Sequence, residues 1–237
     1  MQNNRQSDHS GERIVHMFLT QYFYPLLGIF TEPDISQQID GIDAICKLSG
    51  LGIYDEITID EKCQLTRLNQ TITNNTTQCF EIMSKYRNAE ESYGPGWFSK
   101  DNSTQYYLFT YITKCKTTNQ NSLTIDSIDE MEAIFISKDK VKQLLRSNGI
   151  TMRNLKDFAL FMINQGVHTR YANNKYYYDF WKNNRDMYLC YSKNNLGEAP
   201  VNCIIKWNTL KSVAEYVFSI NKKQIRILSK EGVTANA

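Results

Sequence analysis

The sequence predicts an α/β fold in which a mixed central sheet is flanked by helices. Ile14, Phe18 and Tyr22 recur at helical spacing, which indicates an amphipathic helix near the start of the chain. Residues 56–64 alternate between apolar and polar side chains, as in a half-buried strand. Residues 105–112, with the sequence QYYLFTYI, give the strongest strand signal and favour a central position in the sheet. The chain has 237 residues, 41% of them hydrophobic, which is enough to bury a substantial core.

The remaining elements follow from periodicity and from turn residues. The first helix is expected from Gly11 to near Gly28, and residues 31–38 form a turn or short helix. The other expected elements are strands at 41–48, 56–64, 78–83, 105–112 and 131–136, a helix over 137–146 capped by Ser137, a helix over 152–164, strands at 176–181, 187–191 and 201–206, and a helix over 209–217. We therefore expect disordered residues 1–10, a core of residues 11–150, and a C-terminal α+β extension of residues 151–237 packed on that core.

Composition narrows the class of protein and its compartment. No apolar run is long enough to cross a bilayer and the polar N-terminus lacks a signal core, so we expect a cytoplasmic protein without membrane contact. The six cysteines show no close pairs and predict reduced, buried thiols rather than a zinc site. Residues 1–137 hold 10 Lys and Arg against 18 Asp and Glu, whereas residues 138–237 hold 17 against 7. The basic half either supplies contacts to a polyanion or merely balances an acidic surface.

Two successive strands direct carboxylates and a lysine to one point. In the strand at residues 56–64, alternation places Asp60 and Lys62 on the same face. In the strand at residues 41–48, Asp43 lies opposite the face formed by the small and apolar side chains, and glycines between the strands favour an antiparallel hairpin. The hairpin would place Asp43 beside Asp60. Two converging carboxylates repel each other unless a cation lies between them, and their hard oxygen atoms favour Mg²⁺, with Mn²⁺ as a substitute.

Asp43 followed by Asp60-x-Lys62 after a hairpin resembles the signature of the PD-(D/E)XK nuclease superfamily. The resemblance covers roughly residues 12–136 and implies a restriction-endonuclease-like α-β-β-β-α-β core. It also implies Mg²⁺-dependent cleavage of DNA, with Asp43 and Asp60 as metal ligands and Lys62 as the catalytic lysine. The chain departs from the family pattern at Ile42, where proline is usual, and at Glu61, where an apolar residue is usual.

Alternatives to this interpretation remain open at the level of sequence. Glu61 could be an exposed residue of the sheet, or the register could differ by one residue, which would reverse every side chain. Asp40 competes with Asp43 as the first ligand. An Asp and a Lys two residues apart can also form an ordinary solvated pair on a strand.

Three further residues are candidates for accessory roles. Gln64 is expected to support the site from the end of the strand that carries Lys62. Glu81 supplies another carboxylate if its strand neighbours that of Asp60, and is otherwise a solvent-facing residue. Glu12 matches an accessory acidic position of the family, although we favour the simpler explanation that it interacts with the dipole of the first helical turn.

The C-terminal extension interleaves basic and aromatic residues. Such surfaces bind nucleic acids, because cations contact phosphates while aromatic rings stack on bases. The basic candidates are Arg170, Lys175, Lys182 and Arg185. A tyrosine-rich strand can equally be packed within a sheet.

The sequence thus predicts a metal-dependent endonuclease that hydrolyses DNA, of the restriction or mobile-element type. Cutting both strands of a duplex favours a homodimer. The alternative is a nucleic-acid-binding or assembly protein that keeps a nuclease-like fold without the chemistry. Proximity of the Asp43 and Asp60 carboxylates distinguishes the two hypotheses.

Overall fold

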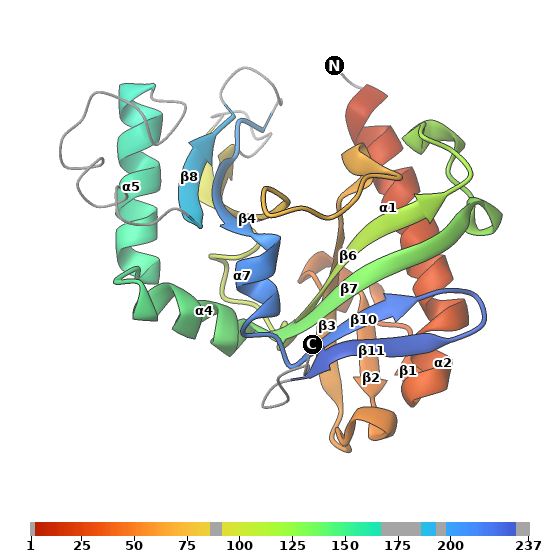
Figure 1. Ribbon diagram of the computed structural model, residues 1–237. Helices are drawn as coiled ribbons and strands as arrows, with labels where there is room; N and C mark the ends of the chain where they lie inside the picture. Colours follow the sequence, from red (N-terminus) through yellow and green to blue (C-terminus); the bar gives the residue numbers. More distant parts are fainter. Residues whose placement is uncertain (1–2, 86–91, 167–185, 193–197, 231–237) are drawn as a thin grey trace. The chain divides into compact units, whose positions relative to one another are not determined.

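The computed structural model describes residues 3–85, 92–166, 186–192 and 198–230 (Figure 1). The chain divides into two compact units, each assembled from separate stretches of sequence. The large-sheet unit comprises Gln2–Thr73, Asn102–Val141 and Lys211–Ala237, and the small-sheet unit comprises Asn74–Asp101 and Lys142–Leu210. This division replaces the boundary expected at residue 150, because strands from the two ends of the chain pair within each sheet. The mixed α/β class is as predicted.

A seven-stranded mixed sheet forms the centre of the large-sheet unit. In order across the sheet, the strands are β1 (Ile29–Thr31), β2 (Ala44–Lys47), β3 (Ile57–Cys63), β6 (Tyr106–Cys115), β7 (Ile128–Ser137), β10 (Tyr216–Ile220) and β11 (Ile225–Lys230). All neighbours are antiparallel except β3 and β6, which run parallel. The strand β6 is the middle strand, which confirms its predicted central position. Its apolar residues are buried on both faces of the sheet.

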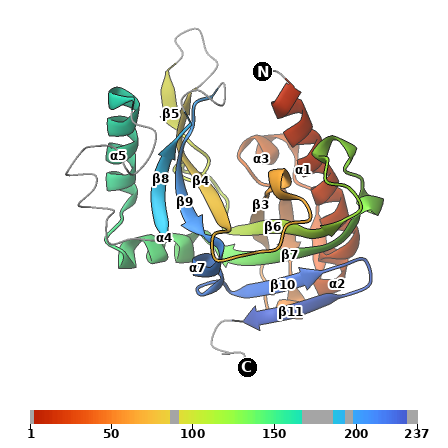
Figure 2. The ribbon, with the colours of Figure 1, turned by 45° about the horizontal axis from the view of Figure 1, so that its top comes forward.

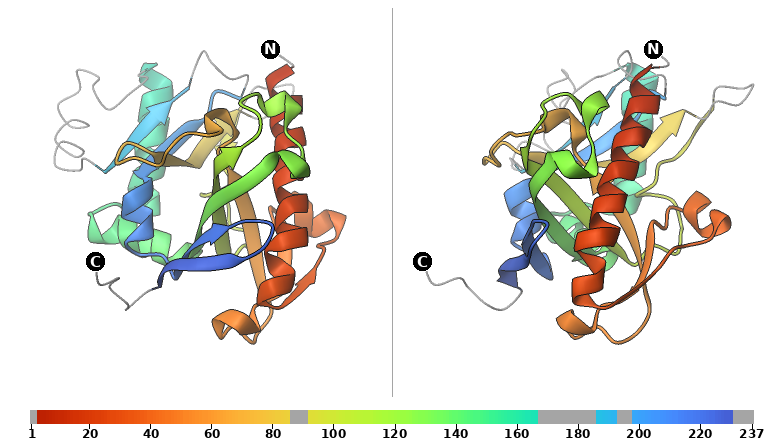
Figure 3. Two further views of the ribbon diagram at one scale, coloured as in Figure 1. Left: turned by 45° about the vertical axis from the view of Figure 1, so that its right-hand side comes forward. Right: turned by 90° about the vertical axis from the view of Figure 1, so that its right-hand side faces the viewer.

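The helix α1 (Asn3–Tyr22) covers one face of this sheet (Figure 3). Val15, Phe18 and Leu19 are at most 2% exposed and share a core with Ile59 and Leu108. The helix begins at Asn3, so the expectation of disorder before Gly11 is wrong for residues 3–10. A helix that is anchored by packing extends readily into a polar segment without proline, because each added residue gains a backbone hydrogen bond.

Short elements complete the large-sheet unit. They are α2 (Tyr24–Leu27), α3 (Ile35–Ile39), η1 (Ser49–Leu51), η2 (Leu65–Arg67), η3 (Gln120–Ser122) and η4 (Ile125–Ser127). The helix α3 is the short helix expected within residues 31–38, and it begins with a capping box between Asp34 and Gln37. Between β2 and β3 the chain turns through η1 and Gly52, whose φ of 78° favours glycine. The predicted hairpin is therefore confirmed.

A four-stranded antiparallel sheet forms the small-sheet unit (Figure 2). In order, its strands are β5 (Tyr93–Pro95), β4 (Thr77–Lys85), β9 (Val201–Lys206) and β8 (Met187–Tyr191). The helix α5 (Met152–Gln165) packs against β4, β8 and β9 through Leu155 and Phe158, among other apolar residues. The strand β4 thus belongs to this sheet. The predicted α-β-β-β-α-β order instead expected it to follow β3 in the large sheet. Nothing local in its sequence specifies its pairing partner.

The helix α4 (Lys138–Ser147) follows β7, and its first turn is capped as predicted, because Lys140 N donates a hydrogen bond of 3.3 Å to Ser137 Oγ.

The prediction of a helix over residues 209–217 is wrong. The chain forms the short helix α7 (Trp207–Lys211) and then the buried strand β10. The run Tyr216–Ile220 is apolar at every position except Ser219. Such a short apolar run occurs both in buried strands and in buried helices, so its pattern does not distinguish the two. The aromatic strand expected at 176–181 lies outside the described residues. All six cysteines are free, and Cys79 is exposed, contrary to expectation.

Candidate functional site

The hairpin of β2 and β3 brings Asp43 and Asp60 side by side. Ala44 pairs with Ile59 across the two strands, so the next positions along the hairpin are Asp43 and Asp60. Asp43 N donates a hydrogen bond of 2.9 Å to Ile59 O, which fixes the backbone at the entrance to β2. The competing residue Asp40 is engaged elsewhere, where its carboxylate accepts a hydrogen bond of 3.1 Å from Ser103 N. The structure therefore brings Asp43, and not Asp40, to Asp60.

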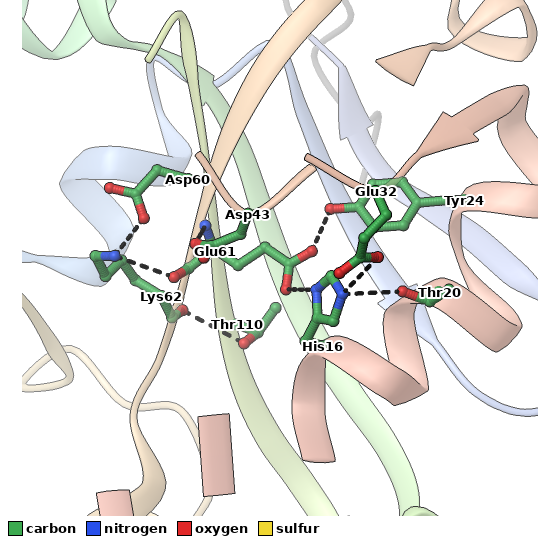
Figure 4. Close-up of polar contacts among 9 residues, drawn as sticks. All are labelled: His16, Thr20, Tyr24, Glu32, Asp43, Asp60, Glu61, Lys62 and Thr110. Atoms are coloured by element: carbon green, nitrogen blue, oxygen red, sulfur yellow. Dashed lines mark hydrogen bonds and ion pairs between the residues drawn. The ribbon is translucent and has the colours of Figure 1, made fainter. Parts of the chain in front are cut away.

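Lys62 lies on the same face of β3 as Asp60 and forms an ion pair with it (Figure 4). The Lys62 side chain is 25% exposed, whereas that of Asp60 is 1% exposed. Burial opposes the charge on Lys62, but the nearby charges of Asp60 and Asp43 raise its pKa above the usual value. The predicted register is thus correct, and the three residues of the motif lie together.

Asp60 carries its charge under unfavourable conditions. Burial raises its pKa from 3.8 to about 7, with Lys62 lowering it and the neighbouring charge of Asp43 raising it. One of its oxygens, Oδ2, has no hydrogen-bond partner in the described part of the chain. Two carboxylates and one ammonium group leave an excess negative charge in a place that is almost shielded from water. A bound cation or a proton would relieve it.

Asp43 and Asp60 are the residues of this site that could hold a divalent cation. Within the described residues, no group of three or more His, Cys, Asp or Glu is arranged to hold a metal ion. Mg²⁺, however, is commonly held by one or two carboxylates, with water and substrate phosphate completing its coordination. Asp43, which lines a cavity, and Asp60, which is buried beside it, are two carboxylates of this kind and are the residues that would hold the ion.

Glu61 lies between Asp60 and Lys62 on β3, and its side chain contacts α1 and α2. Its side chain points to the face of β3 opposite Asp60 and is 7% exposed, so it is not an exposed residue of the sheet. Its carboxylate accepts a hydrogen bond of 2.6 Å from the Tyr24 hydroxyl and lies 3.1 Å from His16 Nδ1 (Figure 4). Its backbone N–H donates a hydrogen bond of 2.8 Å to the Asp43 carboxylate. Glu61 thus connects α1 and α2 to the carboxylate pair.

The Glu61 carboxylate and its partners perturb one another. The hydrogen bond to Glu61 raises the pKa of His16 from 6.5 to about 9, while burial opposes this shift. Burial and the charge of Glu61 raise the pKa of Tyr24 well above its usual value. Protonated His16 and the Tyr24 hydroxyl therefore both contact the Glu61 carboxylate, and its negative charge is balanced by His16 without a metal ion.

Glu12 lies in the middle of α1 and not in its first turn, because the helix begins at Asn3. The favoured explanation through the helix dipole is therefore wrong, since that effect is confined to the first turn. Glu12 instead lines the same cavity as Asp43 and Lys62, and its charge contributes to the raised pKa of Lys62.

The other two accessory candidates are Gln64 and Glu81. Gln64 follows the last residue of β3, and its N–H donates a hydrogen bond of 3.3 Å to Thr110 O. Glu81 is on β4 of the small-sheet unit, so its strand is not a neighbour of β3, and its carboxylate accepts a hydrogen bond of 3.1 Å from Ser84. The nucleic-acid-binding candidates Arg170, Lys175, Lys182 and Arg185 all lie outside the described residues.

A cavity of about 720 Å³ opens beside the motif, within the large-sheet unit. The polar and charged residues that line it are Glu12, Arg13, His16, Thr20, Gln21, Glu32, Gln38, Asp43, Glu61 and Lys62. Sequence reasoning did not identify Arg13, His16 or Tyr24 as neighbours of the site. A signal existed for the first two: Arg13, His16 and Thr20 form a polar stripe on a helix whose other face is core.

In comparisons with known proteins, no family model, no curated protein and no solved structure matches this chain. Among the described residues, no helix combines the length and the apolar composition that spanning a membrane requires.

Proposed function

We propose that this chain is a Mg²⁺-dependent endonuclease that hydrolyses phosphodiester bonds of DNA. One observation carries the proposal. The buried carboxylate of Asp60, with one unpartnered oxygen, lies beside Asp43 and Lys62, which both line one cavity, and the three positions match the Asp43, Asp60-x-Lys62 pattern. Surface pairs of Asp and Lys are solvated and do not bury a carboxylate in this way.

The order of strands supports a restriction-endonuclease-like core. α1 precedes the antiparallel strands β1, β2 and β3, and the next strand of the sheet, β6, runs parallel to β3. A parallel neighbour requires a crossover connection, which the expected α-β-β-β-α-β order provides with a helix. Here residues 64–105 make the crossover and include β4 and β5 of the small-sheet unit.

Each residue of the motif has a definite task in this proposal. Asp43 and Asp60 would hold the cation, which would polarise the phosphate and lower the pKa of a bound water. Lys62 would orient the attacking water and offset the negative charge that grows on the phosphate oxygens as water attacks phosphorus and the P–O bond to the leaving oxygen breaks. Glu61 holds the Asp43 carboxylate in place through its backbone N–H.

The test is cleavage of supercoiled plasmid, single-stranded DNA and RNA in Mg²⁺, Mn²⁺ or EDTA. Asp60→Asn and Lys62→Gln are each expected to lower the cleavage rate about 100-fold or more, as loss of a preorganised charge does elsewhere. Asp126→Asn and Lys223→Gln alter exposed residues of the same unit and are the matched controls, expected to cut like the wild type. Wild-type protein that cuts no substrate, or cutting that persists in Asp60→Asn and Lys62→Gln, contradicts the proposal. Tight DNA binding without cutting favours the non-catalytic alternative.

A further inference from the structure

We infer that Arg13 and His16 on α1 form the phosphate-contacting side of the cavity and position the nucleic-acid backbone against Asp43 and Lys62. This inference rests on the proposed function and adds the residues that hold the substrate. Arg13 and His16 are three residues apart on α1, so they project from the same face of the helix. Both line the cavity that Asp43 and Lys62 line.

The helix that carries them is a rigid support. Val15, Phe18 and Leu19, on its opposite face, are almost completely buried in the core of the large-sheet unit. A helix held in this way fixes the backbone positions from which the two side chains reach the cavity. Substrate-positioning groups need this, because small displacements of a substrate reduce catalysis sharply.

His16 is oriented with one nitrogen toward the cavity. Glu61 binds Nδ1 at 3.1 Å, and since a carboxylate only accepts, Nδ1 carries a hydrogen. The Tyr24 hydroxyl, at 2.6 Å, holds the other oxygen of Glu61, so the imidazole ring is fixed from behind (Figure 4). Nε2 forms an ion pair of 3.4 Å with Glu32, whose side chain is 58% exposed, and lies 3.5 Å from Thr20 Oγ1. A phosphate oxygen at Nε2 would take the place of the exposed Glu32 carboxylate.

Arg13 supplies a cation that the fold does not use. Its side chain is exposed at the cavity and forms no hydrogen bond or ion pair with the described part of the chain. A guanidinium group binds two phosphate oxygens at once, with a geometry that few other side chains reproduce. Lys62, by contrast, is paired with Asp60.

The charges that line the cavity restrict where a phosphate can bind. Four of the lining residues are carboxylates: Glu12, Glu32, Asp43 and Glu61. A phosphate can approach them only where cations offset the repulsion, and Arg13 and His16 place two cations together on one wall. Because the pKa of His16 is raised to about 9, its imidazole remains protonated at neutral pH. Binding is accordingly expected to strengthen when a divalent cation occupies the carboxylate pair.

The test measures binding rather than cutting. A short fluorescein-labelled DNA duplex is titrated with the Lys62→Gln chain in Mg²⁺ at several salt concentrations, with Arg13→Gln, His16→Gln or Arg226→Gln added. Each phosphate contact contributes about 0.9 to the slope of log affinity against log salt. Arg13→Gln and His16→Gln should each lower that slope by about one and weaken binding about tenfold. Arg226 is exposed on β11 and does not line the cavity, so its variant should bind unchanged.

Equal affinity and slope for all variants would overturn the inference. Arg13 is exposed, so Arg13→Gln keeps the test decisive even if His16→Gln fails to fold, which thermal unfolding of each variant would show. The two proposals can fail separately. Binding through Arg13 and His16 in a wild-type chain that never cuts contradicts only the nuclease proposal, whereas unchanged cutting and binding by Arg13→Gln contradicts only this inference. A chain that binds no DNA contradicts both.

Discussion

Replacing Asp60 with asparagine should stabilise the folded chain near neutral pH when no divalent metal is present. Burial raises the pKa of Asp60 from 3.8 to about 7, so the folded chain holds this proton more tightly than the unfolded chain does. The stability that this proton contributes is fully present below pH 3.8 and is lost as the pH rises through about 7. A pKa difference of about three corresponds to about 4 kcal/mol, because a tenfold change in affinity is worth about 1.4 kcal/mol.

Asparagine has the same shape and carries no charge, so it avoids this penalty. The two chains should have similar unfolding free energies at about pH 4, and the asparagine chain should be more stable by up to about 4 kcal/mol at about pH 8. Urea unfolding in EDTA at both pH values measures the difference. Asp126→Asn, at a carboxylate that is 97% exposed, is the matched control and should change stability by less than about 0.5 kcal/mol.

The same experiment reports on the metal. Adding Mg²⁺ at about pH 8 should stabilise the wild-type chain, since a ligand that binds only the folded state adds to its stability, and should leave Asp60→Asn nearly unchanged. An asparagine chain that is less stable than the wild type at about pH 8, or a stability difference that does not depend on pH, would show that burial does not disfavour the charge on Asp60. Active sites often lower the stability of a protein, because a charge that the reaction needs is buried there at a cost in folding free energy.

Three further predictions concern the surroundings of the site. The pKa of His16 is raised from 6.5 to about 9, so protonation of His16 contributes about 3 kcal/mol to the unfolding free energy below pH 6.5, and this contribution is lost as the pH rises through 9. In urea unfolding, the His16→Gln chain should lack this decrease in unfolding free energy with pH. Tyr24→Phe leaves the Glu61 carboxylate without its donor at 2.6 Å and should lower the unfolding free energy by about 1–3 kcal/mol, against no change if the hydroxyl is dispensable. Gly28→Ala would place a Cβ 1.9 Å from Lys47 O, and the resulting backbone shift should cost about 1–3 kcal/mol in thermal unfolding; an unaltered midpoint would contradict the close approach.

Much of the site was predictable because the interactions that define it are local. Alternation along residues 56–64 determines that Asp60 and Lys62 share a face, and the structure agrees. The hairpin that brings Asp43 to Asp60 depends on a turn of a few residues, where Gly52 adopts a positive φ. Most of the helices and strands before residue 206 also follow from short-range periodicity, which depends on neighbouring side chains alone.

Other features depend on partners that are distant in the sequence. His16 and Glu61 are 45 residues apart, and their contact depends on how α1 packs across the sheet. The assignment of Glu12 failed because the start of α1 is decided by packing further along the helix, not by the residues around Gly11. The run Tyr216–Ile220 is apolar in every position but one, so its periodicity does not distinguish a helix from a strand; pairing with β7 decides the outcome.

Local patterning was enough to predict which side chains of the hairpin face together and therefore which residues form the motif. Long-range packing determines that β4 joins a second sheet, that β6 lies beside β3, and that α1 supplies a wall of the cavity. The physical reason is that alternation and turn geometry are set within a few residues. The choice of neighbouring strand is set by the burial of apolar faces over the whole chain, which no short segment encodes.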